Sequence, residues 1–212
     1  MTQLIYNGPK DAAATLVLAH GAGAAMDSPF MNRIAAGVGE LGIRVARFEF
    51  PYMDARRRIG KRGAPDREPV LRATWLEVIE RLGGGPRLII GGKSMGGRIA
   101  SLIADEAGVK GLVCLGYPFH PPGQPQRLRV EHLRALRTPT LIVQGTRDSL
   151  GSREEVDTHG LSSRVRIAWI EQGDHSFKPP KRSGRTLEQN MEEAIALVSG
   201  FISRLHRSGK KV

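Results

Sequence analysis

The 212-residue sequence predicts an α/β fold built on a doubly wound, mostly parallel β-sheet. Short runs rich in Val, Ile and Leu alternate along the chain with longer segments that carry apolar residues at helical spacing. Strands connected through helices run parallel, and the helices then cover both faces of the sheet. A chain of this length can bury a full core as one domain and leaves no room for a large lid, so we expect residues 1–212 to form a single domain.

The apolar runs give six expected parallel strands, near residues 15–19, 43–50, 87–91, 109–116, 139–144 and 164–170. A short first strand near 2–6 would add an antiparallel edge. Helices are expected near residues 28–41, 70–82, 94–107, 127–136, 152–159 and 186–206. Two of these helices begin with the pattern of a capping box, Ser152-x-x-Glu155 and Thr186-x-x-Gln189.

The segment Gly92-Lys-Ser-Met-Gly96 has the G-x-S-x-G pattern of a nucleophile elbow. An apolar strand precedes it, and apolar residues at helical spacing follow it. A serine on a sharp strand-to-helix turn presents its hydroxyl above the edge of the sheet, where it can attack a substrate. The context of the pentapeptide therefore predicts Ser94 as a catalytic nucleophile.

Two later strands end in the residues that such a serine needs as partners. Asp148 follows the strand near 139–144, and His175 follows the strand near 164–170. His175 would accept the proton of Ser94 as general base, and Asp148 would hold the tautomer of the imidazole. Asp174 is the competing acid, but adjacent residues of an extended loop point their side chains apart, which favours Asp148.

Acyl transfer also needs two backbone N–H groups aimed at the developing oxyanion. Met95, the residue after the nucleophile, would supply one of them. A glycine-rich loop, His20-Gly-Ala-Gly-Ala24, follows the first parallel strand and would supply the other, from Ala22 or next from Gly21. His20 itself is interpreted as a residue that orients this loop, because the triad already contains a histidine.

These motifs, together with Phe48-Glu-Phe-Pro-Tyr-Met53, resemble the α/β-hydrolase superfamily over about residues 15–205. Within it the chain is similar to the dienelactone-hydrolase-like proteins, in the group that contains testis-expressed protein 30 and a subunit of a chromatin-modifying complex. The resemblance implies an α/β-hydrolase fold without a sizeable lid and a Ser-His-Asp triad. Dienelactone hydrolases use a cysteine nucleophile where this chain has Ser94, which argues against dienelactone as the substrate.

Two phosphate-binding interpretations fail on particular residues. A P-loop ending at Gly92-Lys-Ser94 would need glycine at position 87, which is Arg87. A dinucleotide fingerprint beginning at Gly21 would need a small residue at position 26, which is Met26. We therefore expect no cofactor, and we expect no metal.

Composition is consistent with a cytoplasmic enzyme. The single cysteine, Cys114, lies in an apolar run and is expected in the core, where it can form no internal disulfide. The first residues have no basic segment followed by a long apolar run, so no signal peptide is indicated. No stretch approaches the roughly 20 apolar residues of a membrane span, so no membrane association is expected.

The net charge of +11 is concentrated in two segments, a cluster at Arg56-Arg-Arg58 with Lys61-Arg62 and a tail at 204–211. The cluster follows the strand near 43–50, at the sheet edge where α/β folds bind ligands, so it could attract anionic substrates. A solvated loop is the alternative. Basic and aromatic residues do not interleave, so nucleic acid is not expected as a partner.

The sequence thus predicts a serine hydrolase that cleaves an ester, thioester or similar activated acyl bond through an acyl-enzyme on Ser94. Its partner would be a small-molecule acyl substrate, anionic if the basic cluster steers it. The alternative is a hydrolase-fold scaffold that binds an acidic protein or nucleic acid without catalysis. Loops 51–69, 117–126 and 176–184 would line the pocket, with apolar contacts from Tyr52, Met53, Tyr117, Phe119 and Phe177.

Overall fold

Seven strands form one sheet, in the order β1-β3-β2-β4-β5-β6-β7, in the computed structural model, which describes residues 2–60 and 63–208. The strands are β1 (Leu4–Asn7), β2 (Thr15–Ala19), β3 (Arg44–Phe48), β4 (Leu88–Lys93), β5 (Gly111–Leu115), β6 (Thr140–Gly145) and β7 (Val165–Ile170). β1 pairs antiparallel with β3, and all other neighbours are parallel. The mostly parallel sheet with an antiparallel edge strand confirms the predicted fold class.

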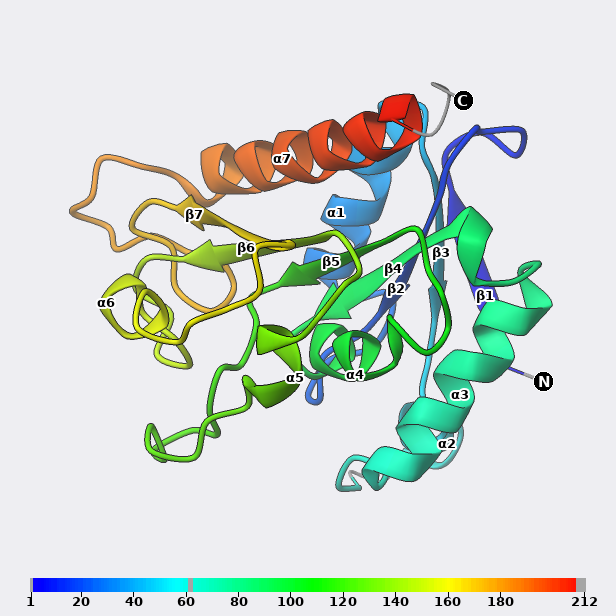
Figure 1. The fold of residues 1–212 in the computed structure, drawn as a ribbon, viewed down its shortest axis with the longest axis horizontal. Helices are drawn as coiled ribbons and strands as arrows, with labels where there is room; N and C mark the ends of the chain where they lie inside the picture. Colours follow the sequence, from blue (N-terminus) through cyan, green and yellow to red (C-terminus); the bar gives the residue numbers. More distant parts are fainter. Residues whose placement is uncertain (1, 61–62, 209–212) are drawn as a thin grey trace.

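Helices cover both faces of this sheet (Figure 1). α1 (Pro29–Glu40) and α7 (Leu187–Ser208) pack together on one face. α3 (Glu68–Arg81), α4 (Met95–Ile103) and the short α5 (Glu131–Arg134) lie on the other face. α2 (Pro51–Ile59), the 3₁₀ turn Gly85–Arg87 and α6 (Arg153–Val156) complete the elements. The parallel strands therefore have an apolar layer on each side, as a doubly wound sheet requires.

Side chains alternate along the strands and separate the core into two clusters. On β2, Leu16 and Leu18 pack with the α1 and α7 side, whereas Val17 and Ala19 pack with the α3 and α4 side. Trp75 of α3 is fully buried on that second side. Because successive residues of a strand point to opposite faces, one short apolar run supplies both cores. This fixes the strand register, and with it the positions of the loops at the carboxyl edge.

The segment after β3 differs from the prediction of a long loop over 51–69. It forms α2, and α3 begins two residues earlier than expected, at Glu68. Pro51 stands in the first turn of α2, where its missing N–H costs nothing and its fixed φ suits a helix. Gly60, with φ 68°, ends the helix in the left-handed conformation. The helices expected at 127–136 and 152–159 are present but only four residues long each, as α5 and α6.

Cys114 lies on β5 and is fully buried, as predicted. Its thiol contacts the carbonyl of Gly97 on α4 at 3.5 Å, and burial raises the pKa of the thiol far above its usual value. Among the described residues, no helix is both long and apolar enough to cross a membrane.

Candidate active site

Ser94 stands on the turn between β4 and α4 with φ 51° and ψ −116°. A non-glycine residue rarely adopts a positive φ, and such strain persists only where the surroundings hold the backbone. The Ser94 amide is held by the carbonyl of Leu115 at 3.0 Å. A Cβ at Gly96 would lie 2.5 Å from the carbonyl oxygen of Ala19, so only glycine lets α4 approach β2 this closely. The turn therefore has the local structure of a nucleophile elbow.

A hydrogen-bonded chain connects Ser94, His175 and Asp148. Nε2 of His175 lies 2.9 Å from Oγ of Ser94, and Nδ1 lies 2.8 Å from Oδ2 of Asp148. A carboxylate only accepts hydrogen bonds, so Nδ1 carries the ring proton and Nε2 is free to accept the serine hydroxyl proton. The Asp148 side chain is fully buried, whereas 28% of the His175 side chain is exposed. The structure thus brings together the three residues that the sequence motifs selected.

Asp148 is held by groups other than His175. Gln144, at the end of β6, donates from Nε2 to Oδ2 of Asp148 at 2.9 Å. The amide of Leu150 donates to the other carboxylate oxygen at 2.9 Å. Gln144 itself is fully buried, and it also pairs with the amide and the carbonyl of Tyr117 at 2.7 and 3.1 Å. These contacts hold the Asp148 side chain in one orientation.

Asp174 binds backbone groups of its own loop. Its Oδ1 accepts hydrogen bonds from the amides of Ser176 and Lys178, at 2.8 and 2.9 Å, and so folds the loop that carries His175. Asn190 of α7 donates to the carbonyl of Phe177 at 2.7 Å and anchors the same loop. Asp174 thus binds loop backbone, whereas Asp148 binds the imidazole.

The glycine-rich loop after β2 runs beside the nucleophile. A Cβ at Gly21 would lie 3.7 Å from Cβ of Ser94. His20 accepts the Phe50 amide on Nε2 at 3.1 Å, so its protonated Nδ1 donates to the carbonyl of Gly21 at 2.7 Å. Burial lowers the pKa of His20 below its usual value and keeps the ring neutral. The tyrosine hydroxyl of Tyr52 donates to the carbonyl of Ala22 at 2.9 Å. Two buried side chains therefore fix the loop.

A cavity of about 260 Å³ opens next to Ser94 and His175. Small residues of the glycine-rich loop form one wall, and the side chains of Phe30, Met31 and Lys93 contribute to the rest. The complete lining is Gly21, Ala22, Gly23, Ala24, Ser28, Phe30, Met31, Lys93, Ser94, His175 and Ser176. Ser94 thus faces a space large enough for a small acyl group.

The residues expected to contact substrate do not line this cavity. Tyr117, Phe119 and Phe177 are fully buried in the core, and Tyr52 holds the glycine-rich loop through its hydroxyl. Met53 is 3% exposed and borders a neighbouring cavity of about 280 Å³. The expectation was wrong for this cavity because the segments 51–69 and 117–126 turn their aromatic side chains inward. The walls of this cavity come mostly from the β2–α1 segment, with Lys93 and, from the expected loop 176–184, Ser176.

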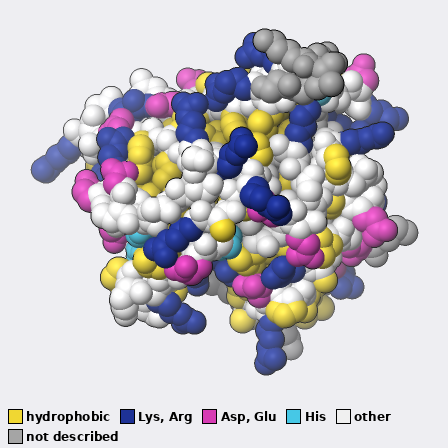
Figure 2. All heavy atoms as spheres, viewed as in Figure 1, with side chains coloured by type: hydrophobic (Ala, Val, Ile, Leu, Met, Phe, Trp, Pro, Cys, Tyr) yellow, Lys and Arg dark blue, Asp and Glu magenta, His cyan; other side chains and the backbone are white. Residues whose placement is uncertain are grey.

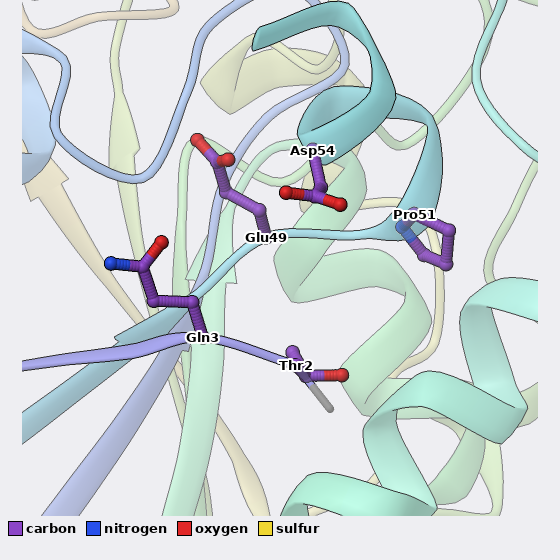
Figure 3. A pocket seen from close by; sticks show the side chains of 5 residues that line it. All are labelled: Thr2, Gln3, Glu49, Pro51 and Asp54. Atoms are coloured by element: carbon purple, nitrogen blue, oxygen red, sulfur yellow. The ribbon is translucent and has the colours of Figure 1, made fainter. Parts of the chain in front are cut away.

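A cavity of about 360 Å³ lies between the start of the chain and α2 (Figure 3). Its lining is Thr2, Gln3, Glu49, Pro51 and Asp54. Figure 3 shows the carboxylates of Glu49 and Asp54 coming from the end of β3 and from α2. The carboxylate of Glu49 is bound by Arg57 at 2.7 Å. The described residues that line this cavity include no histidine, so they do not offer a serine–histidine pair.

Two of the three basic-cluster residues that the structure describes, Arg57 and Arg58, form ion pairs. Arg57 binds Asp27 at 2.8 Å and Glu49 at 2.7 Å, and Arg58 binds Asp54 at 3.1 Å. Arg56 instead reaches the carbonyl of Gly23, at 3.5 Å. Lys61 and Arg62, which belong to the predicted cluster, lie outside the described residues. Figure 2 shows Lys and Arg spread over the visible face with Asp and Glu among them. Arg57 and Arg58 are therefore neutralised by neighbouring carboxylates, whereas Arg56 contacts a backbone carbonyl.

Lys93, the second residue of the elbow motif, was not singled out by sequence reasoning. Its side chain is 8% exposed, and its ammonium donates to the carbonyl oxygen of His175 at 2.7 Å. Gln144 was also missed. A polar residue at the end of an otherwise apolar strand was the only sequence signal for it, whereas the contact of Lys93 joins residues 82 positions apart. Within the described ranges, no group of three potential metal ligands is close enough to bind an ion.

Comparison with solved structures shows the same architecture. A serine hydrolase homologue from Coxiella burnetii gives a TM-score of 0.68 at 22% identity, over 93% of this chain and 91% of that chain. Dienelactone hydrolase from Anabaena variabilis gives a TM-score of 0.69 at 20% identity, over 96% of this chain and 91% of that chain. XC6422 from Xanthomonas campestris is described as an α/β serine hydrolase without a lid. It gives a TM-score of 0.67 at 19% identity, over 96% of this chain and 88% of that chain. These similarities show the fold.

The family comparison covers most of the sequence. A family described as "Alpha/beta hydrolase domain" matches residues 12–203, which include the elbow, the glycine-rich loop and the loops of Asp148 and His175. This match, the sheet order and the similarity to a hydrolase described as lacking a lid agree with the predicted fold. The chain belongs to the α/β-hydrolase domain family.

Proposed function

We propose that the protein is a serine hydrolase that cleaves an ester, thioester or similar activated acyl bond through an acyl-enzyme on Ser94. The hydrogen-bonded chain from Ser94 through His175 to Asp148, at 2.9 and 2.8 Å, is the observation that carries this proposal. His175 accepts the serine proton as Ser94 attacks the carbonyl carbon, and it returns that proton to the leaving group. Water then attacks the acyl-enzyme with His175 again as base.

The oxyanion in this proposal is bound by the amides of Met95 and Ala22. Met95 begins α4, and the first amides of a helix have no partner within the helix. The carbonyl of Gly21 is held by His20. In a trans peptide the following N–H, that of Ala22, points the opposite way from this carbonyl. His20 therefore orients the Gly21–Ala22 peptide, and Ala22 is favoured over Gly21 as donor.

The proposed substrate is a small acyl compound. The cavity beside Ser94 measures about 260 Å³, and its walls are mostly small or apolar residues. Arg56 stands at Gly23, which borders both this cavity and its neighbour of about 280 Å³. An anionic group on the leaving side of the substrate would meet the positive charge of Arg56 there. The narrower similarity to the group containing testis-expressed protein 30 remains a prediction.

Labelling with a fluorophosphonate probe, followed by a panel of acyl esters and thioesters of increasing chain length, tests the proposal. The unmodified protein should be labelled on Ser94, and Ser94→Ala should lose the label and reduce turnover by several orders of magnitude. Ser176→Ala, which removes another hydroxyl from the lining of the same cavity, is the matched control and should keep the label. A folded protein that neither labels nor turns over any ester would favour the scaffold alternative.

A further inference from the structure

Lys93 connects the nucleophile elbow to the loop of the proposed base. Its backbone precedes Ser94 at the end of β4, and its ammonium donates to the main-chain carbonyl of His175 at 2.7 Å. A hydrogen bond from a charged donor is about twice as strong as one between neutral groups. One side chain therefore joins the two segments whose relative position decides whether Nε2 of His175 meets the hydroxyl of Ser94.

Burial of the Lys93 ammonium carries a desolvation cost, and its contacts offset only part of that cost. Among the described residues Lys93 forms no ion pair within 4 Å, and its ammonium lies over the Phe30 ring at 5.5 Å from the ring centroid. Asp148 and Asp174 stabilise the charge at longer range. An apolar side chain of similar length would fill this space without the desolvation cost. The contact to His175 is the feature that such a replacement would lose.

The end of β5 leaves room for this contact. Gly116 has φ 64°, and a Cβ there would lie 2.6 Å from the carbonyl oxygen of His175 and 2.9 Å from Nζ of Lys93. Any larger residue would push these two atoms apart. The carbonyl of His175 therefore sits in a recess formed by Gly116 on one side and by the ammonium of Lys93 on the other.

The other contacts of the loop act on either side of His175. Asp174 binds the amides of Ser176 and Lys178, and Asn190 binds the carbonyl of Phe177. Phe177 has φ 67°, a strained conformation for an aromatic residue. These contacts give the loop its shape, whereas the bond from Lys93 fixes His175 against the elbow.

We propose that Lys93 is a positioning residue whose ammonium, by binding the carbonyl of His175, holds the imidazole in line with Ser94 and Asp148. This inference rests on the function proposed above for Ser94. Displacement of a catalytic group by about 1 Å can cost roughly a hundredfold in rate. The role of Lys93 is therefore expected in the chemical step and not in substrate affinity.

The role of Lys93 also gives the reaction a dependence on pH. Burial lowers the pKa of Lys93 to about 8, although Asp148 and Asp174 oppose the shift. The groups that face its ammonium are those two carboxylates, the His175 loop and the ring of Phe30. Above about pH 8 the amine loses its charge, and the bond to His175 becomes an ordinary neutral one. The rate of acylation should then fall.

The test compares Lys93→Met with Lys178→Met, with rates expressed per site titrated by the fluorophosphonate probe. Lys178 is an exposed lysine of the same loop, so its replacement makes the same change in net charge. K93M should lower kcat about 10- to 100-fold with KM of a neutral ester changed less than about threefold. K178M should have the same kcat and KM as the unmodified protein. The alkaline decline of kcat near pH 8 should be present in the unmodified protein and absent from K93M.

Four results would overturn the role of Lys93. Equal acylation rates per titrated site in K93M and the unmodified protein would remove it while leaving Ser94 as the nucleophile. An unchanged kcat with a raised KM for anionic esters alone would make Lys93 a substrate-binding cation instead. If K93M does not fold, the unmodified protein still decides: a rate independent of pH between about 7 and 9.5 would contradict the proposal. Failure of the unmodified protein to label would overturn this role and the proposed function together.

Discussion

Gln144 donates a hydrogen bond to the same oxygen of Asp148, Oδ2, that accepts the ring N–H of His175. Gln144 belongs to β6, the strand that leads into the Asp148 loop, and its side chain also binds both backbone groups of Tyr117 at the end of β5. The acid is thereby tied to two strands of the central sheet. Its orientation depends on the sheet as well as on the loop.

Replacement of Gln144 should therefore affect stability and rate together. Gln144→Leu would leave the Tyr117 amide without its buried partner, which should lower the free energy of unfolding by about 2–4 kcal/mol. Because Asp148 would also lose a donor, kcat should fall about tenfold or more in the protein that remains folded. Chemical denaturation and initial rates measure the two effects. Gln124→Leu, at an exposed position, is the control and should change neither.

Replacements of Asp148 and Asp174 by asparagine should have clearly different effects on kcat. Asp148→Asn keeps the shape of the side chain but favours the wrong tautomer of His175, so kcat should fall by about 10⁴. Asp174→Asn retains an oxygen that can accept from the amides of Ser176 and Lys178, so its effect should stay within about tenfold. A larger loss of kcat in the Asp174 variant would show that the catalytic acid had been assigned to the wrong carboxylate.

Arg56 should contribute to a preference for anionic substrates. The other two described arginines of the cluster, Arg57 and Arg58, are bound by Asp27, Glu49 and Asp54. At low ionic strength, Arg56→Gln should lower kcat/KM for an anionic ester by about two- to fivefold and leave that for a neutral ester unchanged. Added salt should reduce the difference, since exposed charges are screened over roughly 10 Å at 0.1 M.

The control for this measurement is Arg58→Gln, which removes an equal charge from a side chain that is 70% exposed and paired with Asp54. This variant should leave kcat/KM unchanged for both the anionic and the neutral ester. If the unmodified protein shows the same salt dependence for anionic and neutral esters, the cluster serves only as solvated surface.

His132 should make the fold less stable in mild acid. It lies against Ser101, at 2.8 Å, and burial together with the charge of Arg98 lowers its pKa to about 4. Between about pH 6.5 and 4 the unfolded chain binds a proton that the folded protein does not, so stability falls as the pH falls through this window. With allowance for solvent screening at this partly exposed ring, the loss is about 1–2 kcal/mol.

Denaturation of His132→Gln over the same range measures that contribution. The variant should show a shallower loss of stability between pH 6.5 and 4, because it lacks this titrating ring. The pKa values of His20 and His159 are lowered as well, and their contributions remain in both proteins. Identical slopes for the variant and the unmodified protein would contradict the assignment to His132.

The strands and the order of the site residues could be predicted because each depends on a short segment. The apolar run before Ser94 and the glycine on each side of it specify a strand and a turn without reference to the rest of the chain. Asp148 and His175 were found in the same way, since each follows a strand directly. Local patterns therefore gave the sheet and the candidate triad.

What the sequence could not provide depends on contacts between distant segments. α2 was missed because its arginines suggested a solvated loop, whereas Pro51 and Gly60 set its two ends. Tyr52 was expected at the substrate but binds Ala22, 30 residues away. The bond from Lys93 to His175 spans 82 residues. Such pairs follow from strand order and register, which no local pattern contains.

The buried position of Cys114 makes its thiol a probe of local opening between β5 and α4. The thiol lies under α4, beneath the turn that carries Ser94, and a reagent can reach it only when β5 and α4 separate. In native conditions the rate of its modification by a disulfide reagent would therefore measure how often this part of the fold opens. Since the described chain has no other thiol, the signal would come from one place. Variants of the elbow could thus be compared for opening and for turnover in the same sample.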